Sequence, residues 1–247
     1  MDRMIYVAMT GAREAMRSQT LVAHNVANAS TTGFREVRHS VASAPVPGPG
    51  FGTRVNPVSI GDTWDATSGT MVQTGRDLDI AVQGAGWIAV QDANGAEAYT
   101  RAGNLRINAA GLLETASGEL VRGNGGPISI PPFNELYVGD DGQISIVPQG
   151  QSPESLATVD RIKLVNPPPE QLMQTGNGLF RKTDGGAAVA DANVRIASGQ
   201  LESSNVNAAA ALVEMIELAR TYDMQVRAMH TADENSAAAA RLMRSGG

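Results

Sequence analysis

Residues 201–247 read LESSNVNAAA ALVEMIELAR TYDMQVRAMH TADENSAAAA RLMRSGG, with no proline and no glycine before Gly246. A stretch without helix-breaking residues predicts one long helix over residues 205–244, with a cap among residues 203–205. Small and apolar residues recur along it at alternating steps of three and four, which is the heptad spacing of a coiled coil. These positions are Leu212, Met215, Ala219, Tyr222, Val226, Met229, Asp233, Ser236, Ala240 and Met243, of which Asp233 and Ser236 are polar.

The N-terminal segment has the same character. Residues 1–36 hold no proline and only two glycines, Gly11 and Gly33. The same alternation of steps selects Ile5, Ala8, Ala12, Ala15, Gln19, Val22 and Val26. We therefore expect two long terminal helices that pair as a coiled coil and present further apolar surface to neighbouring subunits. The alternative is two amphipathic helices lying on the surface of one globular core.

The middle of the chain differs in composition from both ends. All 12 prolines lie between Pro45 and Pro169, and all but four of the 27 glycines lie between the terminal segments. Short alternating runs such as residues 79–83 and 87–91 flank glycine-rich turns, which is typical of antiparallel strands. Because no helical pattern separates these runs, an antiparallel all-β domain is expected rather than a parallel α/β sheet. The predicted fold class is therefore α+β.

These changes in composition predict four segments. They are an N-terminal axial helix with its exit motif (1–36), an extended connector (37–75), a central β-domain (76–200) and a C-terminal coiled-coil helix (201–247). The connector is expected to be extended rather than packed, because Pro45, Pro47 and Pro49 lie close together within it.

Composition and charge exclude several classes of function. The 247 residues include no cysteine, which excludes thiolate metal sites, disulfides and cysteine nucleophiles. A net charge of −6 with no basic run argues against sequence-independent binding of nucleic acid. No run approaches the roughly 18–20 apolar residues of a membrane span. With Asp2 at its start and a short apolar run, the N-terminus is not expected to be a cleavable secretory signal.

The candidate metal and phosphate sites are weak. The histidines His24, His39 and His230 are far apart in the sequence and form no metal-binding pair. The glycine-rich stretches at residues 84–86 and 123–126 do not open helices, so they lack the free N–H groups that bind phosphate. We expect no metal-binding residue, no cofactor-binding residue and no cofactor.

One pair of carboxylates is the best candidate for catalysis. Asp77 and Asp79 are two residues apart and could share a strand face, as the paired acids of a hydrolase do. The adjacent Arg76 favours a solvated, partly paired strand edge instead. No catalytic residue is therefore predicted, and a hydrolase built on the β-domain remains the weaker alternative.

Residues 21–35, LVAHNVANASTTGFR, describe the exit of a helix. Asn28 and Gly33 are residue types that suit left-handed backbone at the end of a helix. The side chains of residues 30–32 can form hydrogen bonds to the backbone groups left unpaired there, and Phe34 can pack against the helix end. The stretch resembles the signature of the bacterial flagellar rod and hook proteins. Three further segments are similar to the same family in the same order: residues 74–82, residues 99–105, and residues 199–207 with the helix that follows them.

The resemblance implies a structural subunit of the flagellar basal-body rod, in its proximal part, with a distal-rod subunit as the alternative. A secreted β-domain adhesin with a coiled-coil stalk is a weaker possibility. The implied location is the periplasm, reached through flagellar type III export without cleavage of a signal. The implied role is to transmit torque and to line the export channel.

The implied partners are other rod subunits, further copies of this chain and the export apparatus, with no nucleic acid and no membrane-embedded part. The expected assembly interface consists of Ile5, Ala8, Ala12, Ala15, Val22, Asn25, Val26, Asn28, Gly33, Phe34, Leu212, Met215, Ala219, Tyr222, Val226 and Met229.

Overall fold

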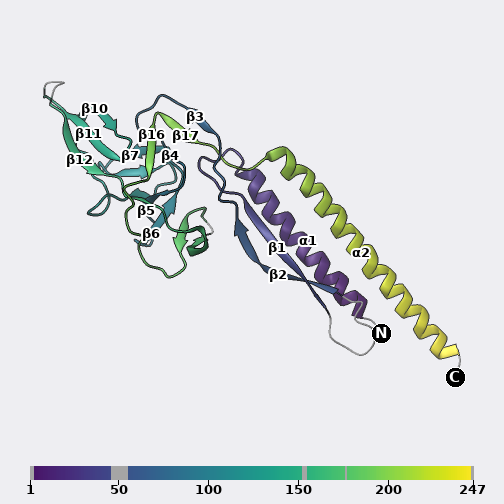
Figure 1. The fold of residues 1–247 in the computed structure, drawn as a ribbon. Coiled ribbons are helices and arrows are strands. Elements are labelled where there is room, and N and C mark those ends of the chain that lie inside the picture. Colours follow the sequence, from purple (N-terminus) through teal and green to yellow (C-terminus); the bar gives the residue numbers. More distant parts are fainter. Residues whose placement is uncertain (1–2, 46–54, 152–154, 176, 246–247) are drawn as a thin grey trace. The chain divides into compact units, whose positions relative to one another are not determined.

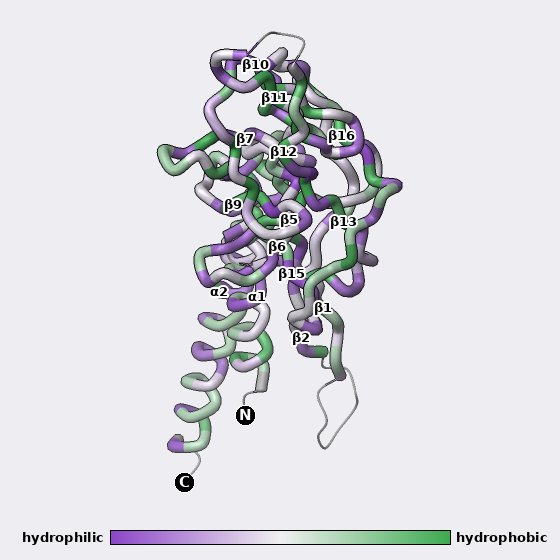
Figure 2. The backbone as a smooth tube through the Cα atoms, turned by 90° about the vertical axis from the view of Figure 1, so that its left-hand side faces the viewer, coloured by the Kyte–Doolittle hydropathy of each residue, from purple (hydrophilic) through white to green (hydrophobic). Residues whose placement is uncertain are grey.

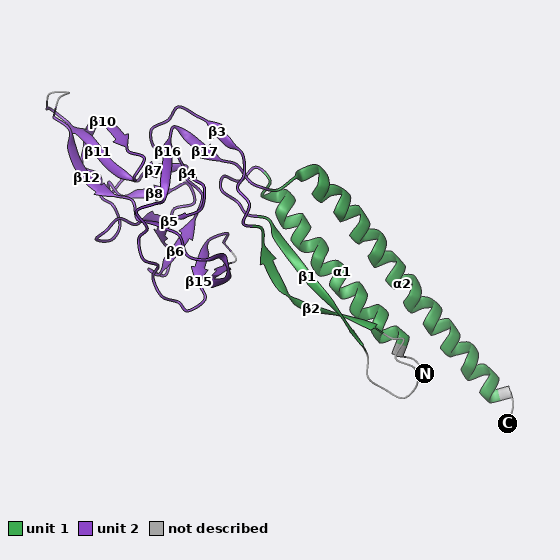
Figure 3. Cartoon of the chain, in the orientation of Figure 1, with its two compact units in different colours: residues 1–29, 36–65, 206–247 green, residues 30–35, 66–205 purple. Residues whose placement is uncertain are grey.

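The computed structural model describes residues 3–45, 55–151, 155–175 and 177–245. The chain divides into two compact units (Figure 3). The helical unit comprises residues 1–29, 36–65 and 206–247, and the β-unit comprises residues 30–35 and 66–205. Each unit is therefore assembled from segments that are distant in the sequence.

The helical unit contains two helices and one β-hairpin (Figure 1). Helix α1 spans Arg3–Ala27 and helix α2 spans Ala208–Ser245. Strand β1 (Val37–Pro45) pairs antiparallel with strand β2 (Val55–Trp64). Helix α1 contacts both α2 and the hairpin, so it is the central element of this unit. Within the described residues, neither helix combines the length and hydropathy that a membrane span requires.

Small residues allow the two helices to approach closely. A Cβ atom added at Gly11 of α1 would lie 3.0 Å from the side-chain carbon Cδ of Gln225 on α2. The buried apolar residues of the two helices are Ala8, Ala12, Ala15 and Val22 on α1, and Ala211 and Ala232 on α2. The buried apolar residues of the two helices are therefore mostly alanines.

The expectation of two long helices paired as a coiled coil is wrong, although the α+β class and the central β region are present. Helix α1 has 25 residues against 38 in α2, and it also packs on the hairpin. Ala211 and Ala232 are buried in α2, whereas the neighbouring Leu212 and Asp233, which the heptad spacing selects, are exposed. With alanine on several faces of α2, the spacing alone could not identify the face that packs.

Residues 37–75 contain more structure than an extended connector. They hold β1, β2 and strand β3 (Met71–Gln73). The hairpin register runs from Val37↔Trp64 to Pro45↔Val55. A two-stranded sheet has two outer edges, and these tolerate proline because no ladder hydrogen bond is needed there. Pro47 and Pro49 lie outside the described residues.

The β-unit is built from antiparallel strand pairs wherever the structure describes a pairing between strands. Its remaining strands are β4 (Ile80–Gln83), β5 (Trp87–Gln91), β6 (Glu97–Thr100), β7 (Leu105–Ile107), β8 (Leu113–Thr115), β9 (Leu120–Val121), β10 (Phe133–Val138), β11 (Gln143–Pro148), β12 (Ala157–Arg161), β13 (Leu164–Val165), β14 (Leu172–Gln174), β15 (Phe180–Lys182), β16 (Arg195–Ser198) and β17 (Gln200–Glu202). One 3-10 helix spans Pro169–Gln171.

These strands form one large sheet and several small ones. The large sheet has the order β14-β15-β6-β5-β9-β8-β7, with β13 also paired to β5. A second sheet has the order β10-β11-β12, while β16 pairs with β4 and β17 pairs with β3. A single aliphatic core that includes Ile80, Ile88, Leu105, Leu113 and Ile144 lies among them. Figure 2 shows the corresponding hydrophobic stretches along the strands of this unit.

Candidate functional site

A buried carboxylate in the β-unit joins three segments of the chain. Glu202, at the end of β17, lies with its Oε1 atom 2.7 Å from Nη2 of Arg35 and its Oε2 atom 3.0 Å from Nη1 of Arg101. The backbone N–H of Gly69 also donates to Oε1 at 2.9 Å. The side chains of Arg35 and Glu202 are both fully buried. We call Arg35, Arg101 and Glu202 the ion cluster.

Backbone hydrogen bonds and a close contact between chain segments fix the backbone around the ion cluster. The N–H of Gly33 donates to the carbonyl of Glu202 at 2.8 Å, and the N–H of Asn205 donates to the carbonyl of Phe34. Gly33 has φ +68°, and a Cβ atom there would lie 2.2 Å from the carbonyl carbon of Arg101. Only glycine fits this position, because it combines left-handed backbone with close approach of another chain segment.

An aromatic ring lies against both arginines of the ion cluster. The guanidinium carbons of Arg101 and Arg35 lie 5.4 Å and 6.0 Å from the ring centroid of Trp87, which are distances typical of cation–π contact. Trp87 in turn packs on Phe180, with ring centroids 4.5 Å apart. Burial lowers the pKa of Arg101, and nearby Arg35 acts in the same direction, while Glu202 opposes the change.

Two asparagines of the exit motif act within the helical unit. Asn25 is buried; its Nδ2 donates to the carbonyl of Val37 at 2.7 Å, and its Oδ1 accepts from the N–H of Val37 at 3.0 Å. It therefore holds the start of β1 on α1. Asn28 donates from Nδ2 to the carbonyl of His24, and its backbone is not left-handed, in contrast to the expectation from its sequence.

The start of α2 is capped two residues beyond the expected range. The side-chain oxygen of Asn207 accepts from the N–H of Ala210 at 3.1 Å, so Asn207 is the cap rather than a residue among 203–205. Residues 203–205 instead bond within the β-unit. Ser203 bonds to Thr70, for example, through both its N–H and its hydroxyl.

The residues expected at the assembly interface fall into three classes of exposure. Buried are Ala8, Ala12, Ala15, Val22, Asn25, Gly33 and Phe34. Partly buried are Ile5, Val26, Asn28, Met215, Ala219, Tyr222, Val226 and Met229, and Leu212 is exposed. Much of the predicted set therefore packs inside a unit, and the set stays a prediction as far as contact with other subunits is concerned.

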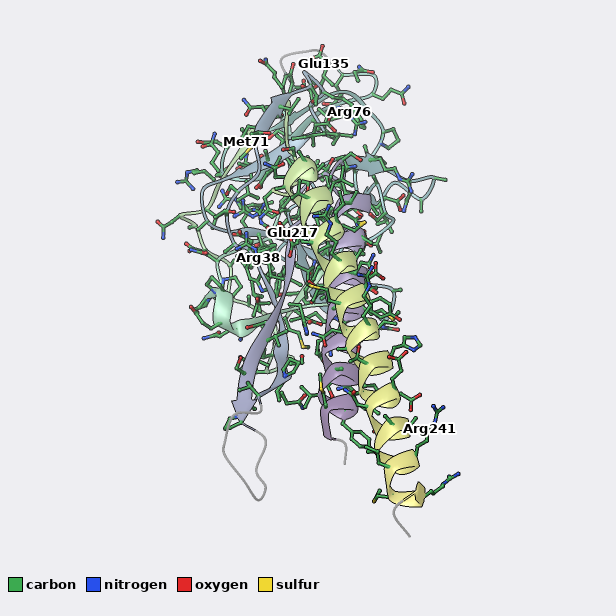
Figure 4. All side chains as sticks on the ribbon, turned by 90° about the vertical axis from the view of Figure 1, so that its right-hand side faces the viewer. Arg38, Met71, Arg76, Glu135, Glu217 and Arg241 are labelled. Atoms are coloured by element: carbon green, nitrogen blue, oxygen red, sulfur yellow. The ribbon has the colours of Figure 1, made fainter. Side chains whose placement is uncertain are left out.

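A different set of large apolar residues is exposed on the helical unit. It comprises Met4, Tyr6, Met9 and Met16 on α1, Val41, Val55, Val58 and Ile60 on the hairpin, and Leu212, Val213, Ile216, Met224, Leu242 and Met243 on α2. Figure 4 shows the side chains of α2, with Glu217 nearer the start of the helix and Arg241 nearer its end. Exposed apolar residues on all three elements are typical of a surface that other chains cover.

Of the two carboxylates considered for catalysis, Asp79 forms an ion pair, 3.1 Å from Nη2 of Arg76, and is buried rather than solvated, whereas Asp77 is exposed. Nearby, Leu78, Phe133 and Tyr137 help to line a surface groove of about 550 Å³. Among the described residues, no group of histidine, aspartate and glutamate is arranged to hold a metal ion.

Two segments of the chain match known families. Residues 197–242 match the family described as flagellar basal body rod FlgEFG protein C-terminal, and residues 81–146 match the flagellar hook protein FlgE/F/G D1 domain. The flagellar basal-body rod protein FlgF of Salmonella typhimurium is 39% identical over 98% of this chain and 99% of its own length. The chain belongs to the flagellar basal-body rod family. The membership predicted from residues 21–35 and 199–207 is thus confirmed.

Within the rod family, two FlgF proteins share more residues with this chain than a FlgG protein does. FlgF of Escherichia coli is 39% identical over 98% of this chain and 99% of its own length. FlgG of Bacillus subtilis is 29% identical over 95% of this chain and 96% of its own. Membership in a family of structural rod proteins argues against the adhesin and hydrolase alternatives.

The ion cluster is a buried feature that the sequence did not predict. Glu202 and Arg35 both lie in the segments that carry the family resemblance, while Arg101 lies in the matched D1 segment. The sequence does show a basic residue, Arg35, in one motif and an acidic residue, Glu202, in the other. Neither motif by itself shows that these two side chains form an ion pair.

Proposed function

We propose that this chain is a structural subunit of the proximal flagellar rod, assembled with copies of itself and with other rod proteins, including FlgG. It transmits torque, lines the export channel and lies in the periplasm, which it reaches through flagellar type III export. It catalyses no reaction and needs no cofactor. Similarity to FlgF proteins along nearly the whole chain supports this proposal over a FlgG-like, distal-rod role.

The observation that carries the proposal is the exposed apolar surface of the helical unit. On α2, Leu212, Val213 and Ile216 are each about half exposed although they are large and apolar. Burial in a neighbouring subunit would stabilise them by roughly 25 cal/mol for each Å² removed from water. Accessible members of the predicted interface, such as Leu212, would then contact other rod subunits together with Ile216.

The ion cluster supports a role in carrying load. Residues 30–35 lead out of α1 and residues 203–205 lead into α2, and both segments are bonded within the β-unit. A force applied to either helix therefore reaches the β-unit through a segment fixed by several bonds. A buried network of this kind resists deformation more than a solvated linker would.

The proposal is tested by introducing a charge on α2. We expect Ile216→Asp to abolish swimming when it replaces the natural copy in its own bacterium, because a carboxylate cannot be buried unpaired between subunits. The matched control is Val189→Asp, at an apolar residue of the β-unit that is 87% exposed. The control should swim, and both proteins should be present in normal amount. Normal swimming of the Ile216→Asp strain would contradict the proposed surface.

A further inference from the structure

Three asparagines of the β-unit, Asn94, Asn124 and Asn177, are each followed directly by glycine, and all three are exposed. The side-chain amide of such an asparagine is lost when the backbone nitrogen of the next residue attacks its Cγ atom. A following glycine favours the attack because it has no Cβ atom and its backbone moves freely. The attacking nitrogen must first give up its proton, so a hydrogen bond from that N–H slows the reaction.

At two of these sites the N–H of the glycine is bonded within a turn. The N–H of Gly95 donates to the carbonyl of Asp92 at 3.0 Å, and the N–H of Gly178 donates to the carbonyl of Thr175 at 3.0 Å. In the first of these turns the N–H of Asn94 is also bonded, to Oδ1 of Asp92 at 2.9 Å. Attack at either site therefore requires the turn to open first.

The third site lacks this protection. Within the part of the chain that the structure describes, neither the N–H of Gly125 nor the side-chain amide of Asn124 has a hydrogen-bond partner. A Cβ atom added at Gly125 would meet nothing within 4 Å apart from its chain neighbours, so there is room for a ring to form. The ends of the loop are fixed, however, because the N–H of Gly123 donates to the carbonyl of Gly126 at 2.7 Å.

We propose that Asn124 deamidates spontaneously and that its turn opens as a result, whereas the fold protects Asn94 and Asn177. The backbone nitrogen of Gly125 loses its proton and bonds to Cγ of Asn124. The bond from Cγ to the amide nitrogen breaks, and ammonia leaves with that proton. Water then opens the cyclic imide at one of its two carbonyl carbons. The product is an aspartate, or an isoaspartate in which the main chain passes through the former side chain.

Both products change the loop. Each adds one negative charge, and the carboxylate of Asp160 already lies against the loop, since a Cβ atom at Gly123 would be 2.2 Å from its Oδ2 atom. Isoaspartate also lengthens the main chain between Gly123 and Gly126 by one CH₂ group. The hydrogen bond between these two glycines should therefore be lost in the isoaspartate form.

Peptide mapping by mass spectrometry tests the proposal on the full chain incubated at mildly alkaline pH. We expect Asn124 to convert at least about fivefold faster than Asn94 and Asn177, because a backbone hydrogen bond must open first at those two sites. In concentrated urea the three sites should convert at similar rates, since each is an asparagine followed by glycine. Equal rates in the folded chain, or the same order of rates in urea as in the folded chain, would overturn the proposal.

Two variants isolate the chemistry and its consequence. Gly125→Ala should convert severalfold more slowly at Asn124, and the fold should tolerate it because φ at Gly125 is not positive and the space is open. Asn124→Asp carries the new charge on a main chain of normal length. Amide hydrogen exchange at Gly123 should therefore lose protection in the isoaspartate form but not in Asn124→Asp, with amides of β5 as the reference. Unchanged conversion in Gly125→Ala, or unchanged protection of Gly123 in the isoaspartate form, would overturn the proposal.

Discussion

Replacing Glu202 by glutamine removes the one negative charge of the ion cluster while keeping its shape. Arg101 would keep acceptors in the carbonyl oxygens of Val82 and Gly84 and would still face the ring of Trp87. Arg35, whose Nε and Nη1 atoms have no hydrogen-bond partner among the described residues, would lose its carboxylate altogether. Most of the cost therefore comes from one fully buried, uncompensated guanidinium.

The magnitude follows from the burial of both partners. Removing one member of a buried ion pair costs about 3–5 kcal/mol, because the desolvation of the other charge is no longer offset. We expect the free energy of unfolding of the β-unit to fall by about that amount in Glu202→Gln. Urea unfolding followed by tryptophan fluorescence measures it, in a Trp64→Phe background that leaves Trp87 as the single tryptophan.

Two comparisons make this result interpretable. Asp141→Asn neutralises a carboxylate whose partner Arg161 is about half exposed, so it should change the unfolding free energy by less than about 1 kcal/mol. Arg35→Met in the Glu202→Gln protein removes the unpaired charge and should recover part of the loss. If the unfolding free energy of Glu202→Gln is within about 1 kcal/mol of that of the natural protein, the buried charge of Glu202 does not stabilise the β-unit.

Two further substitutions test other features of the β-unit. Gly33→Ala should lower the midpoint of thermal unfolding by several degrees, because φ +68° and the backbone of Arg101 leave no room for a methyl group; an unchanged midpoint in calorimetry would contradict this. Burial is the main cause that raises the pKa of Tyr99. Above about pH 10 this tyrosine therefore ionises only in the unfolded chain, and the unfolding free energy of the natural protein should fall as pH rises. Tyr99→Phe should lose less over the same range in urea unfolding, and an equal loss would show that Tyr99 is not the cause.

The helices and their packing differ in how far the sequence predicts them. The absence of proline and the scarcity of glycine at both ends place both helices, because few residues there interrupt helical backbone. Which face of α2 packs depends on its neighbours, and the residues buried on it are Ala211 and Ala232, while Leu212 is exposed. On α2 the heptad spacing selects Leu212, whereas the neighbouring, smaller Ala211 is the residue that is buried.

The hairpin and the ion cluster depend on contacts that no local pattern contains. Prolines near residue 45 favour an extended chain, yet Asn25 and His39 hold that chain on α1 through side-chain hydrogen bonds. Arg35 and Glu202 come together only when the two ends of the β-unit meet. In both cases the residue types can be read from the sequence, but the residues they contact are determined by the tertiary fold.

The two units should respond to mutation in different assays. The β-unit buries its aliphatic core and its ion cluster within itself, so a change at Glu202 or Tyr99 alters the stability of the isolated protein. The helical unit exposes Ile216 and similar residues, whose burial requires other subunits, so a change there leaves isolated stability nearly unaltered and acts on assembly. Stability measured on the purified chain and swimming measured in the cell are therefore complementary, and a substitution that lowers both has acted through folding rather than through the interface.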